Sequence, residues 1–264
     1  MVYYFSGTGN STFVATTLAN FLGETLEFIP DVDPRTLLKP ESRFLLVFPI
    51  YSWGVPPLVG KFIEDISSEY WSRLKEKGLS VDCVMTCGDE VALAPEMITK
   101  VFKKRGVVLN SIWSVIMPNN YVLLPGFDVD SKELEQKKLK ESESRILEIA
   151  QSLNRFDKRI DVIVGSMPWI KTKLVFPLFK KWGIFPKKWH YTDACISCGR
   201  CAKICPLLNI TMVGSHPKWG KNCCSCLGCY HVCPSHAVEY GKETKKKGQY
   251  LFPLPKIAMR KLHT

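Results

Sequence analysis

The N-terminal half of the chain alternates short apolar runs with longer stretches in which apolar residues recur every three or four positions. The apolar runs predict buried β-strands at about 1–5, 25–29, 43–48, 80–86 and 107–117. The periodic stretches predict helices near 11–22, 57–77, 91–105 and 131–155. Strands that alternate with helices are typical of a parallel sheet with both faces covered. The pattern therefore predicts an α/β fold built on a doubly wound five-stranded parallel sheet.

The rest of the chain predicts a second, smaller domain, because 264 residues suit two domains better than one. No run approaches the roughly eighteen uninterrupted apolar residues of a transmembrane helix. The first strand starts without the features of a secretory signal, so we expect a cytoplasmic location. The predicted organisation is a sheet domain, a connector, a cysteine-rich domain and a basic tail, at 1–160, 161–189, 190–242 and 243–264.

The connector mixes aromatic side chains with lysines between residues 174 and 182. This composition is compatible with peripheral contact with a membrane surface. However, Pro168, Pro177 and Pro186 are expected to interrupt any long helix. We favour an apolar strap packed between the two domains, and we expect the basic run 242–248 to form a solvated tail.

Nine of the eleven cysteines lie between residues 195 and 233, in two runs of the form C-x2-C-x2-C-x3-C-P. Three closely spaced cysteines can reach three irons of one 4Fe-4S cube, and the fourth thiolate must come from elsewhere. A pair of zinc sites is the alternative, although such sites rarely use two runs of this length that each end in Cys-Pro. The runs favour iron–sulfur clusters over a disulfide framework.

Residues 190–242 resemble the bacterial two-4Fe-4S ferredoxins, a likeness that implies a small α+β ferredoxin-like domain and low-potential electron transfer. In that pattern the last cysteine of each run ligates the other cluster. The first cluster is therefore assigned to Cys195, Cys198, Cys201 and Cys233. The second cluster is assigned to Cys223, Cys226, Cys229 and Cys205.

Several sulfur and imidazole side chains lie outside this pattern. Cys224 is interpreted as a spare thiol, with a role as a ligand as the alternative. His231 and His236 are expected at the surface, with hydrogen bonds near the cluster sulfur as the alternative. Cys83 is expected to point into the sheet. Cys87 is interpreted as a small buried hydrophobe, with a role as a catalytic or flavin-tuning thiol as the alternative.

A turn rich in glycine and hydroxyl side chains follows the first strand and opens a helix. Such a turn offers backbone N–H groups, hydroxyls and the positive end of a helix to a phosphate. It lacks the lysine of a P-loop and the spacing of the dinucleotide fingerprint. The candidate phosphate-binding residues are Ser6, Thr8, Gly9, Asn10 and Ser11.

Two further loops follow the third and fourth strands, where ligands of an open α/β sheet bind. Their aromatic rings suit stacking on a flavin, and their backbone amides suit its polar edge. The candidate residues are Pro49, Tyr51, Ser52, Trp53, Gly54, Thr86, Cys87, Gly88 and Asp89.

The first 155 residues resemble a flavodoxin, whose phosphate loop has the form Ser/Thr-x-Thr-Gly-x-Ser/Thr. The resemblance implies bound FMN and single-electron chemistry. The third loop lacks the tyrosine that often covers the ring, and residues 117–121 are not an ordinary flavodoxin feature. We expect residues 117–121 to shape a substrate or domain interface. The whole chain is similar to flavodoxin-ferredoxin fusion proteins of anaerobic microbes.

The formal charge of +11 is concentrated in the second half. Residues 161–264 hold 17 Lys and Arg against 4 Asp and Glu. Two clusters with four thiolates each would remove about 4 units of that charge. We do not expect nucleic-acid binding, because stacking aromatics are not interleaved with the basic residues.

The sequence thus predicts an electron-transfer protein that relays electrons between FMN, two 4Fe-4S clusters and an external redox partner. The basic half is expected to attract an acidic partner. The alternative is a flavin-dependent reductase of a small organic substrate, with Trp53 and 119–121 lining its pocket. A redox sensor is a third class for which no residue gives evidence. Neither the oligomeric state nor the identity of the partner follows from the sequence.

Overall fold

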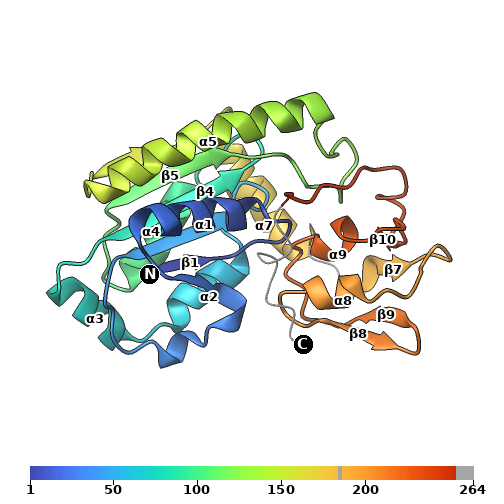
Figure 1. Cartoon of the computed structure of the whole chain (residues 1–264), viewed down its shortest axis with the longest axis horizontal. Helices are drawn as coiled ribbons and strands as arrows, with labels where there is room; N and C mark the ends of the chain where they lie inside the picture. Colours follow the sequence, from blue (N-terminus) through green and yellow to red (C-terminus); the bar gives the residue numbers. More distant parts are fainter. Residues whose placement is uncertain (184–185, 254–264) are drawn as a thin grey trace.

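The protein consists of a sheet half and a cysteine-rich half that lie side by side (Figure 1). The computed structural model describes residues 1–183 and 186–253. No helix within these described ranges is long and apolar enough to cross a membrane.

The sheet half contains six parallel strands in the order β2-β1-β3-β4-β5-β6. They are β1 (Val2–Tyr4), β2 (Leu26–Phe28), β3 (Phe44–Pro49), β4 (Val81–Cys87), β5 (Ser111–Ile116) and β6 (Arg159–Asp161). The expected α/β fold with a doubly wound parallel sheet is confirmed. The sixth strand escaped the sequence pattern because β6 is an exposed edge strand without an apolar run.

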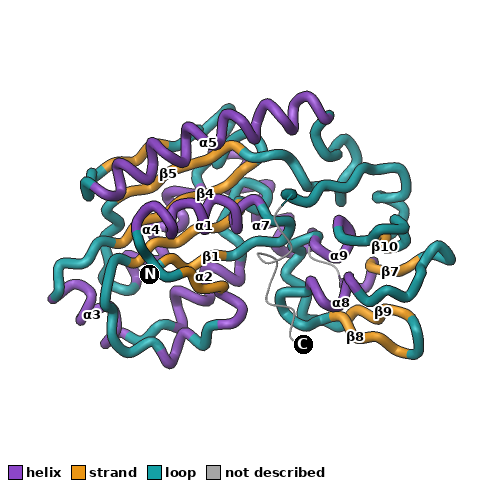
Figure 2. The backbone as a smooth tube through the Cα atoms, viewed as in Figure 1, coloured by secondary structure: helices purple, strands orange, loops and turns teal. Residues whose placement is uncertain are grey.

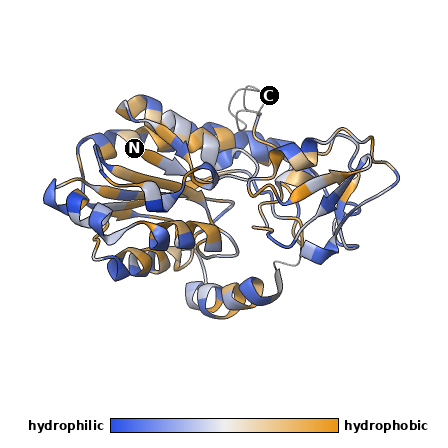
Figure 3. Ribbon diagram, turned by 90° about the horizontal axis from the view of Figure 1, so that it is seen from below, coloured by the Kyte–Doolittle hydropathy of each residue, from blue (hydrophilic) through white to orange (hydrophobic). Residues whose placement is uncertain are grey.

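Helices cover both faces of the sheet, and Figure 3 shows its hydrophobic strands between them. One face packs on α1 (Asn10–Leu22) and α5 (Lys132–Asn154). The other packs on α2 (Pro57–Asp65), α3 (Ser68–Glu76) and α4 (Ala94–Lys104). Two 3₁₀ turns, η1 (Ile29–Asp31) and η2 (Pro34–Thr36), follow β2.

The helix expected at 57–77 is in fact two helices, and the sequence prediction is wrong on this point. Ile66 has an extended backbone that ends α2. The Ser67 side chain then accepts a hydrogen bond from the Tyr70 N–H and caps α3. A serine N-cap inside an amphipathic stretch is the signal that divides it.

A single helical segment, residues 168–183, runs from the sheet half toward the cysteine-rich half, and we call it the strap helix. It consists of α6 (Pro168–Ile170), the π-helical η3 (Lys171–Val175), α7 (Phe176–Leu178) and the π-helical η4 (Phe179–Gly183). The expectation that prolines prevent a long helix is wrong here. Pro168 lies in the first turn, where no N–H is needed, and π-helical turns flank Pro177.

The cysteine-rich half has little regular structure, as the extent of loop in Figure 2 shows. The turn η5 (Pro186–Lys188) precedes its first strand. Its strands form two antiparallel pairs, β7 (Trp189–Tyr191) with β10 (Val238–Tyr240) and β8 (Ile210–Val213) with β9 (His216–Trp219). Two short helices, α8 (Arg200–Ile204) and α9 (Gly228–His231), carry cysteines from the two runs.

The segment after β10 is basic, as expected, but residues 243–253 are not a solvated tail. The Tyr250 side chain is buried, and its hydroxyl donates a hydrogen bond of 2.7 Å to Asn10 Oδ1 in the sheet half. The Phe252 ring stacks on Phe13 at a centroid distance of 4.5 Å. These contacts tie the two halves together. The rest of the predicted tail, 254–264, lies outside the described residues.

Candidate functional site

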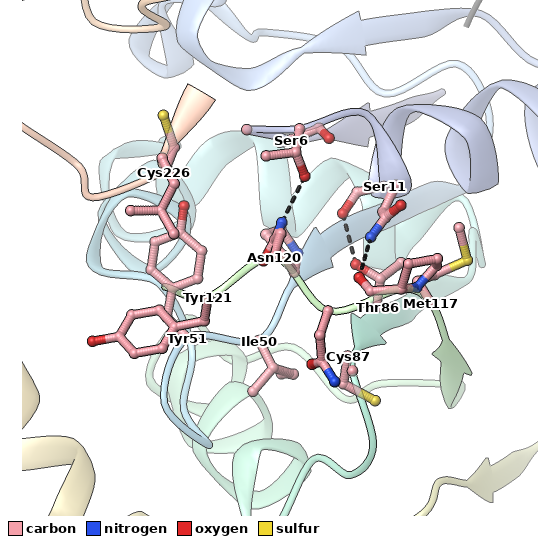
Figure 4. Close-up of a pocket in the computed structure, with 18 of the residues that line it drawn as sticks. Ser6, Ser11, Ile50, Tyr51, Thr86, Cys87, Met117, Asn120, Tyr121 and Cys226 are labelled. Atoms are coloured by element: carbon pink, nitrogen blue, oxygen red, sulfur yellow. Dashed lines mark hydrogen bonds between the residues drawn. The ribbon is translucent and has the colours of Figure 1, made fainter. Parts of the chain in front are cut away.

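A cavity opens at the edge of the sheet where the carboxyl ends of β1, β3, β4 and β5 meet (Figure 4). Its volume is about 90 Å³, and about 680 Å³ when the open mouth is included. Four loops that follow these strands form most of its wall. The strap helix contributes Phe179, and the second cysteine run contributes Ser225, Cys226 and Leu227.

The loop between β1 and α1 brings polar groups to one end of the cavity. Gly9 adopts a positive φ of 101° and precedes α1, which has no side-chain hydrogen bond at its N-cap. The first N–H groups of a helix lack partners within the helix, so an uncapped N-terminus attracts an anion. The members of the predicted phosphate loop that line the cavity are Ser6, Thr8, Asn10 and Ser11.

Hydrogen bonds to neighbouring strands hold this loop in place. Ser11 Oγ lies 2.8 Å from Thr86 Oγ1 at the end of β4. The Asn120 amide donates to Thr8 Oγ1 at 2.6 Å, and the Asn10 amide donates to the Pro118 carbonyl at 2.9 Å. Figure 4 marks the bonds of Ser11 and Asn120. Residues 117–121 therefore form a wall of the cavity.

The loop after β3 is a tight turn. Tyr51 and Gly54 exchange two backbone hydrogen bonds, of 3.0 and 2.9 Å, around Ser52 and Trp53, which both have positive φ. This is the geometry of a two-residue hairpin turn. It points Tyr51 and Ser52 at the cavity. Trp53 instead lies under the Lys171 ammonium group, 5.4 Å from its ring centroid.

The structure therefore brings most of the predicted cavity residues together, but not all of them. Besides the phosphate-loop members, the predicted residues on the wall are Pro49, Tyr51, Ser52, Thr86, Cys87 and Gly88. Those that do not line it are Gly9, Trp53, Gly54 and Asp89. Sequence reasoning missed the contributions of Phe179 and of Ser225 and Leu227, for which the linear sequence carries no signal.

The four cysteines assigned to the first cluster line one small cavity in the cysteine-rich half, namely Cys195, Cys198, Cys201 and Cys233. Cys233 comes from the second run, so the two runs meet as the spacing predicts. The Ala237 N–H donates to Cys233 Sγ at 3.2 Å. Cys198 is exposed, whereas Cys201 and Cys233 are buried.

The four cysteines assigned to the second cluster also lie close together. Cys223 and Cys229 each interact electrostatically with Cys205 and Cys226. The Asn209 N–H donates to Cys205 Sγ at 3.2 Å. No group of three or more His, Cys, Asp or Glu side chains in the described ranges is arranged to hold a single metal ion. A 4Fe-4S cube is larger than one ion and requires its thiolates to be spread further apart.

The indole of Trp219 faces the second cysteine group. Its Nε1 is buried without a hydrogen-bond partner at bonding distance. Burial raises the pKa of the Cys229 thiol well above its usual value, and the Trp219 N–H acts in the opposite direction. A buried donor without a partner is rare in folded proteins. A sulfur-rich group between these cysteines would give it an acceptor.

The second cysteine group adjoins the main cavity. A Cβ placed on Gly7 would meet the Cys226 carbonyl oxygen at 2.2 Å, so these two backbones are in direct contact. Tyr51 interacts with the nearby Cys223, Cys224 and Cys226, and its buried hydroxyl has no hydrogen-bond partner. The cavity and the second cysteine group therefore share a wall.

Cys224, interpreted from the sequence as a spare thiol, does not line the cavity but interacts with Tyr51, which does. Its hydrogen bond to Cys226 lowers the pKa of Cys226 and raises that of Cys224. Cys87 is buried at the end of β4, and burial raises the pKa of its thiol. Burial likewise raises the pKa of Cys83 well above its usual value. Neither of these two thiols is activated as a nucleophile.

His231 was expected at the surface, but it is buried between the two halves, with 4% of its surface exposed. Its Nδ1 accepts the Tyr250 N–H at 3.1 Å, which leaves Nε2 to donate to the Asn120 carbonyl at 2.7 Å. Burial lowers the pKa of His231 to about 4, so the ring is neutral. It links the second cysteine run to the wall of the cavity.

Comparisons with known proteins address the cysteine-rich half most directly. Residues 189–211 match the model of the 4Fe-4S binding domain family. No curated protein matches the chain. Among solved structures, the Trp repressor binding protein from Bacillus subtilis is similar with a TM-score of 0.35 and 15% identity, covering 59% of this chain and 97% of that one. The chain thus contains a ferredoxin-type 4Fe-4S binding domain and takes part in iron–sulfur electron transfer.

Proposed function

We propose that this protein is an electron carrier that holds two 4Fe-4S clusters and FMN and exchanges electrons with an external redox partner. The observation that carries the proposal is the shared wall. A single cavity at the carboxyl edge of the sheet is bounded both by the strand-end loops and by residues 225–227 of a cysteine run. Ligands of open α/β sheets bind at this edge.

The residues of the cavity suit FMN. The loop before the uncapped α1 would hold the phosphate, and the Ser6 and Asn10 side chains lie on the wall beside it. Tyr51 would pack on the ring, and Gly88 lies on the same wall. Bound FMN would supply the conversion between one-electron and two-electron transfer.

The two cysteine groups differ in their surroundings, and this difference assigns them different roles. Cys198 of the first group is exposed, and exposed Ile196 and Leu208 lie in the loops on either side of α8. Cys226 of the second group lies at the cavity wall. We assign the first group to the outer cluster, nearest a partner, and the second to the inner cluster, nearest the flavin.

The partner is proposed to be acidic. Residues 161–264 carry 13 more basic than acidic side chains, and such an excess accelerates encounter with an acidic protein at low salt. Raising the ionic strength should therefore slow transfer between the two proteins. Rates that do not change with salt would contradict the acidic partner. None of the eleven cysteines, all of which lie in the described ranges, forms a disulfide, which suits a reducing compartment such as the cytoplasm.

The experiment that tests the proposal is anaerobic purification followed by iron, sulfide and FMN quantitation. We expect about eight irons, about eight sulfides and one FMN per chain. The double variant Thr8→Val/Ser11→Ala should lose FMN and keep its iron, whereas Cys195→Ser should lose iron from the outer cluster. Eight irons with no binding of added FMN would overturn the flavin assignment. About four irons would overturn the second cluster.

A reductase of a small organic substrate is the alternative. Asn119 and Asn120 line the cavity, but their amides already bond to Asp130 and Thr8. Trp53 does not line the cavity at all. These contacts favour the carrier. Rapid reoxidation of the reduced protein by one class of organic acceptor, with no response to acidic redox proteins, would reverse this preference.

A further inference from the structure

The strap helix packs on the sheet half through one side only. Thr172, Phe176 and Phe179 are buried, at spacings of four and three residues. Thr172 Oγ1 accepts the Leu93 N–H at 3.0 Å and donates to the Trp53 carbonyl at 2.9 Å. The Phe176 ring lies against Gly54, where an added Cβ would meet it at 2.5 Å. This side is fixed by contacts to two loops of the sheet half.

The opposite side of the same helix exposes large apolar side chains. Scattered single exposed hydrophobics are ordinary, but a continuous group on one helix indicates an interaction surface. Here Ile170, Leu174 and Leu178 recur every four residues on the side opposite Thr172 and Phe176, with exposed fractions of 45, 51 and 50%. Met167 and Trp169, which are 63 and 59% exposed, extend the apolar surface at the N-terminal end of the helix.

The charged side chains of the segment itself are all of one sign. No Asp or Glu occurs between Asp161 and Asp193, whereas six lysines do. Lys171 is paired with Glu90 of the sheet half. An apolar stripe flanked by lysines without acidic residues is complementary to an apolar surface that carries negative charge.

A groove beside the stripe has the same character. It lies between the strap helix and α4, and its volume is about 550 Å³. Met97, Phe176 and Pro177 provide apolar lining, and Lys173, Lys180 and Lys181 also line it. Lysine headgroups above an apolar floor suit an anionic amphiphile, with a phosphate at the rim and a hydrocarbon chain below it.

We propose that the strap helix docks this protein on the surface of a bilayer that contains anionic phospholipids. The apolar side chains enter the boundary between headgroups and acyl chains, and the lysines bind the lipid phosphates. In Figure 3 the strap helix lies at the lower edge of the molecule, where a flat surface can reach it. The proposal does not depend on FMN or on the number of clusters.

The test is co-sedimentation of the full chain, purified anaerobically, with lipid vesicles. We expect binding to vesicles of phosphatidylcholine mixed with phosphatidylglycerol, and much weaker binding to phosphatidylcholine alone. Lys173→Gln/Lys180→Gln/Lys181→Gln should weaken binding about a hundredfold, because each lysine near an anionic surface contributes about fivefold. The matched control replaces three exposed lysines elsewhere, Lys75, Lys137 and Lys140, with Gln and should bind like the wild type.

The apolar contribution needs its own variant. Ile170→Ser/Leu174→Ser/Leu178→Ser should abolish binding to the mixed vesicles and leave the iron content and the urea unfolding midpoint unchanged. If that variant fails to fold, fluorescence quenching by brominated lipids can be compared between the wild type and Trp169→Phe. The quenched component should disappear with Trp169.

Three outcomes would overturn the proposal. The first is no binding to the mixed vesicles, and the second is binding that the lysine variant and its control lose equally. The third is a wild-type chain that self-associates in sedimentation velocity and becomes monomeric in the Ser variant, which would make this side an interface between two copies.

Discussion

Adding one methyl group at Gly7 is the most direct test of the shared wall, because the backbone of Gly7 contacts Cys226. Gly7 lies in the loop after β1, and Cys226 lies in the second cysteine run. The backbone of Gly7 has no positive φ, so alanine fits its conformation. Any effect of Gly7→Ala therefore comes from the space that the methyl group occupies.

The magnitude follows from the geometry. An added Cβ would lie 2.2 Å from the Cys226 carbonyl oxygen and 2.8 Å from its Cβ. Ordinary contact begins near 3.4 Å, so the two loops must separate by roughly 1.2 Å. Both obstructing atoms belong to the backbone or its first side-chain carbon, and no rotamer change relieves the clash. Overpacking of this kind costs about 1–3 kcal/mol.

Two assays detect this cost. Urea unfolding of the holoprotein should show a free energy of unfolding lower by about 1–3 kcal/mol. If the loops separate locally instead, the same energy should weaken FMN binding about five- to 150-fold. In either case, stopped-flow reduction through the iron–sulfur domain should reach the flavin more slowly than in the wild type.

Gly60→Ala is the matched control. Gly60 lies in α2 with no atom within 4 Å of an added Cβ, and its φ is not positive. Alanine is the better helix former, so this variant should be more stable by up to about 1 kcal/mol. A Gly7→Ala protein with wild-type stability, wild-type FMN affinity and wild-type flavin reduction would refute the shared wall.

Three further predictions follow from other contacts. Thr172→Val leaves the Leu93 N–H without its acceptor and should lower the free energy of unfolding by about 1–3 kcal/mol in a urea titration. The Thr99 hydroxyl bonds only within α4, so Thr99→Val should lower the free energy of unfolding by less. Trp219→Phe removes a buried N–H beside Cys229 and should make the midpoint potential of the inner cluster more negative in a spectroelectrochemical titration. An unchanged potential would exclude a hydrogen bond from Trp219 to the sulfur of this cluster. Removal of iron should abolish amide protection in residues 189–240 and preserve it in 1–160 in hydrogen exchange, because the small core of 189–240 is built around Cys201, Cys229 and Cys233. Protection that persists in 189–240 would show that this segment folds without metal.

Local patterning was a reliable guide for strands that are buried along their whole length. β3 and β4 read as buried strands because nearly every residue in them is apolar and buried on both faces of the sheet. The pattern failed at Arg159–Asp161, an exposed edge strand, and at Ser67, whose capping hydrogen bond divides one amphipathic stretch into two helices. The strap helix was missed because prolines were expected to interrupt a helix, whereas the π-helical turns on either side of Pro177 allow the helix to continue.

In the candidate site, too, some features were predictable from the sequence and others were not. The phosphate loop was predictable because its residues are contiguous and end at a helix N-terminus. The cysteine groups were predictable because their spacing reflects the size of a 4Fe-4S cube. His231 was misplaced because its burial depends on Asn120 and Tyr250, which lie 111 and 19 residues away. Cys226 and Leu227 gave no sign in the sequence that they would reach the cavity.

The sequence by itself determined the parallel sheet, the turn rich in glycine and hydroxyls before α1 and the two cysteine runs, because each depends on the period or spacing of neighbouring residues. Only the tertiary structure decided how the two halves meet. Gly7 lies against Cys226, residues 243–253 return to α1, and the strap helix turns an apolar side outward. These are contacts between surfaces distant in sequence. They depend on shape and on the loss of water from both partners, which no local pattern of residues encodes.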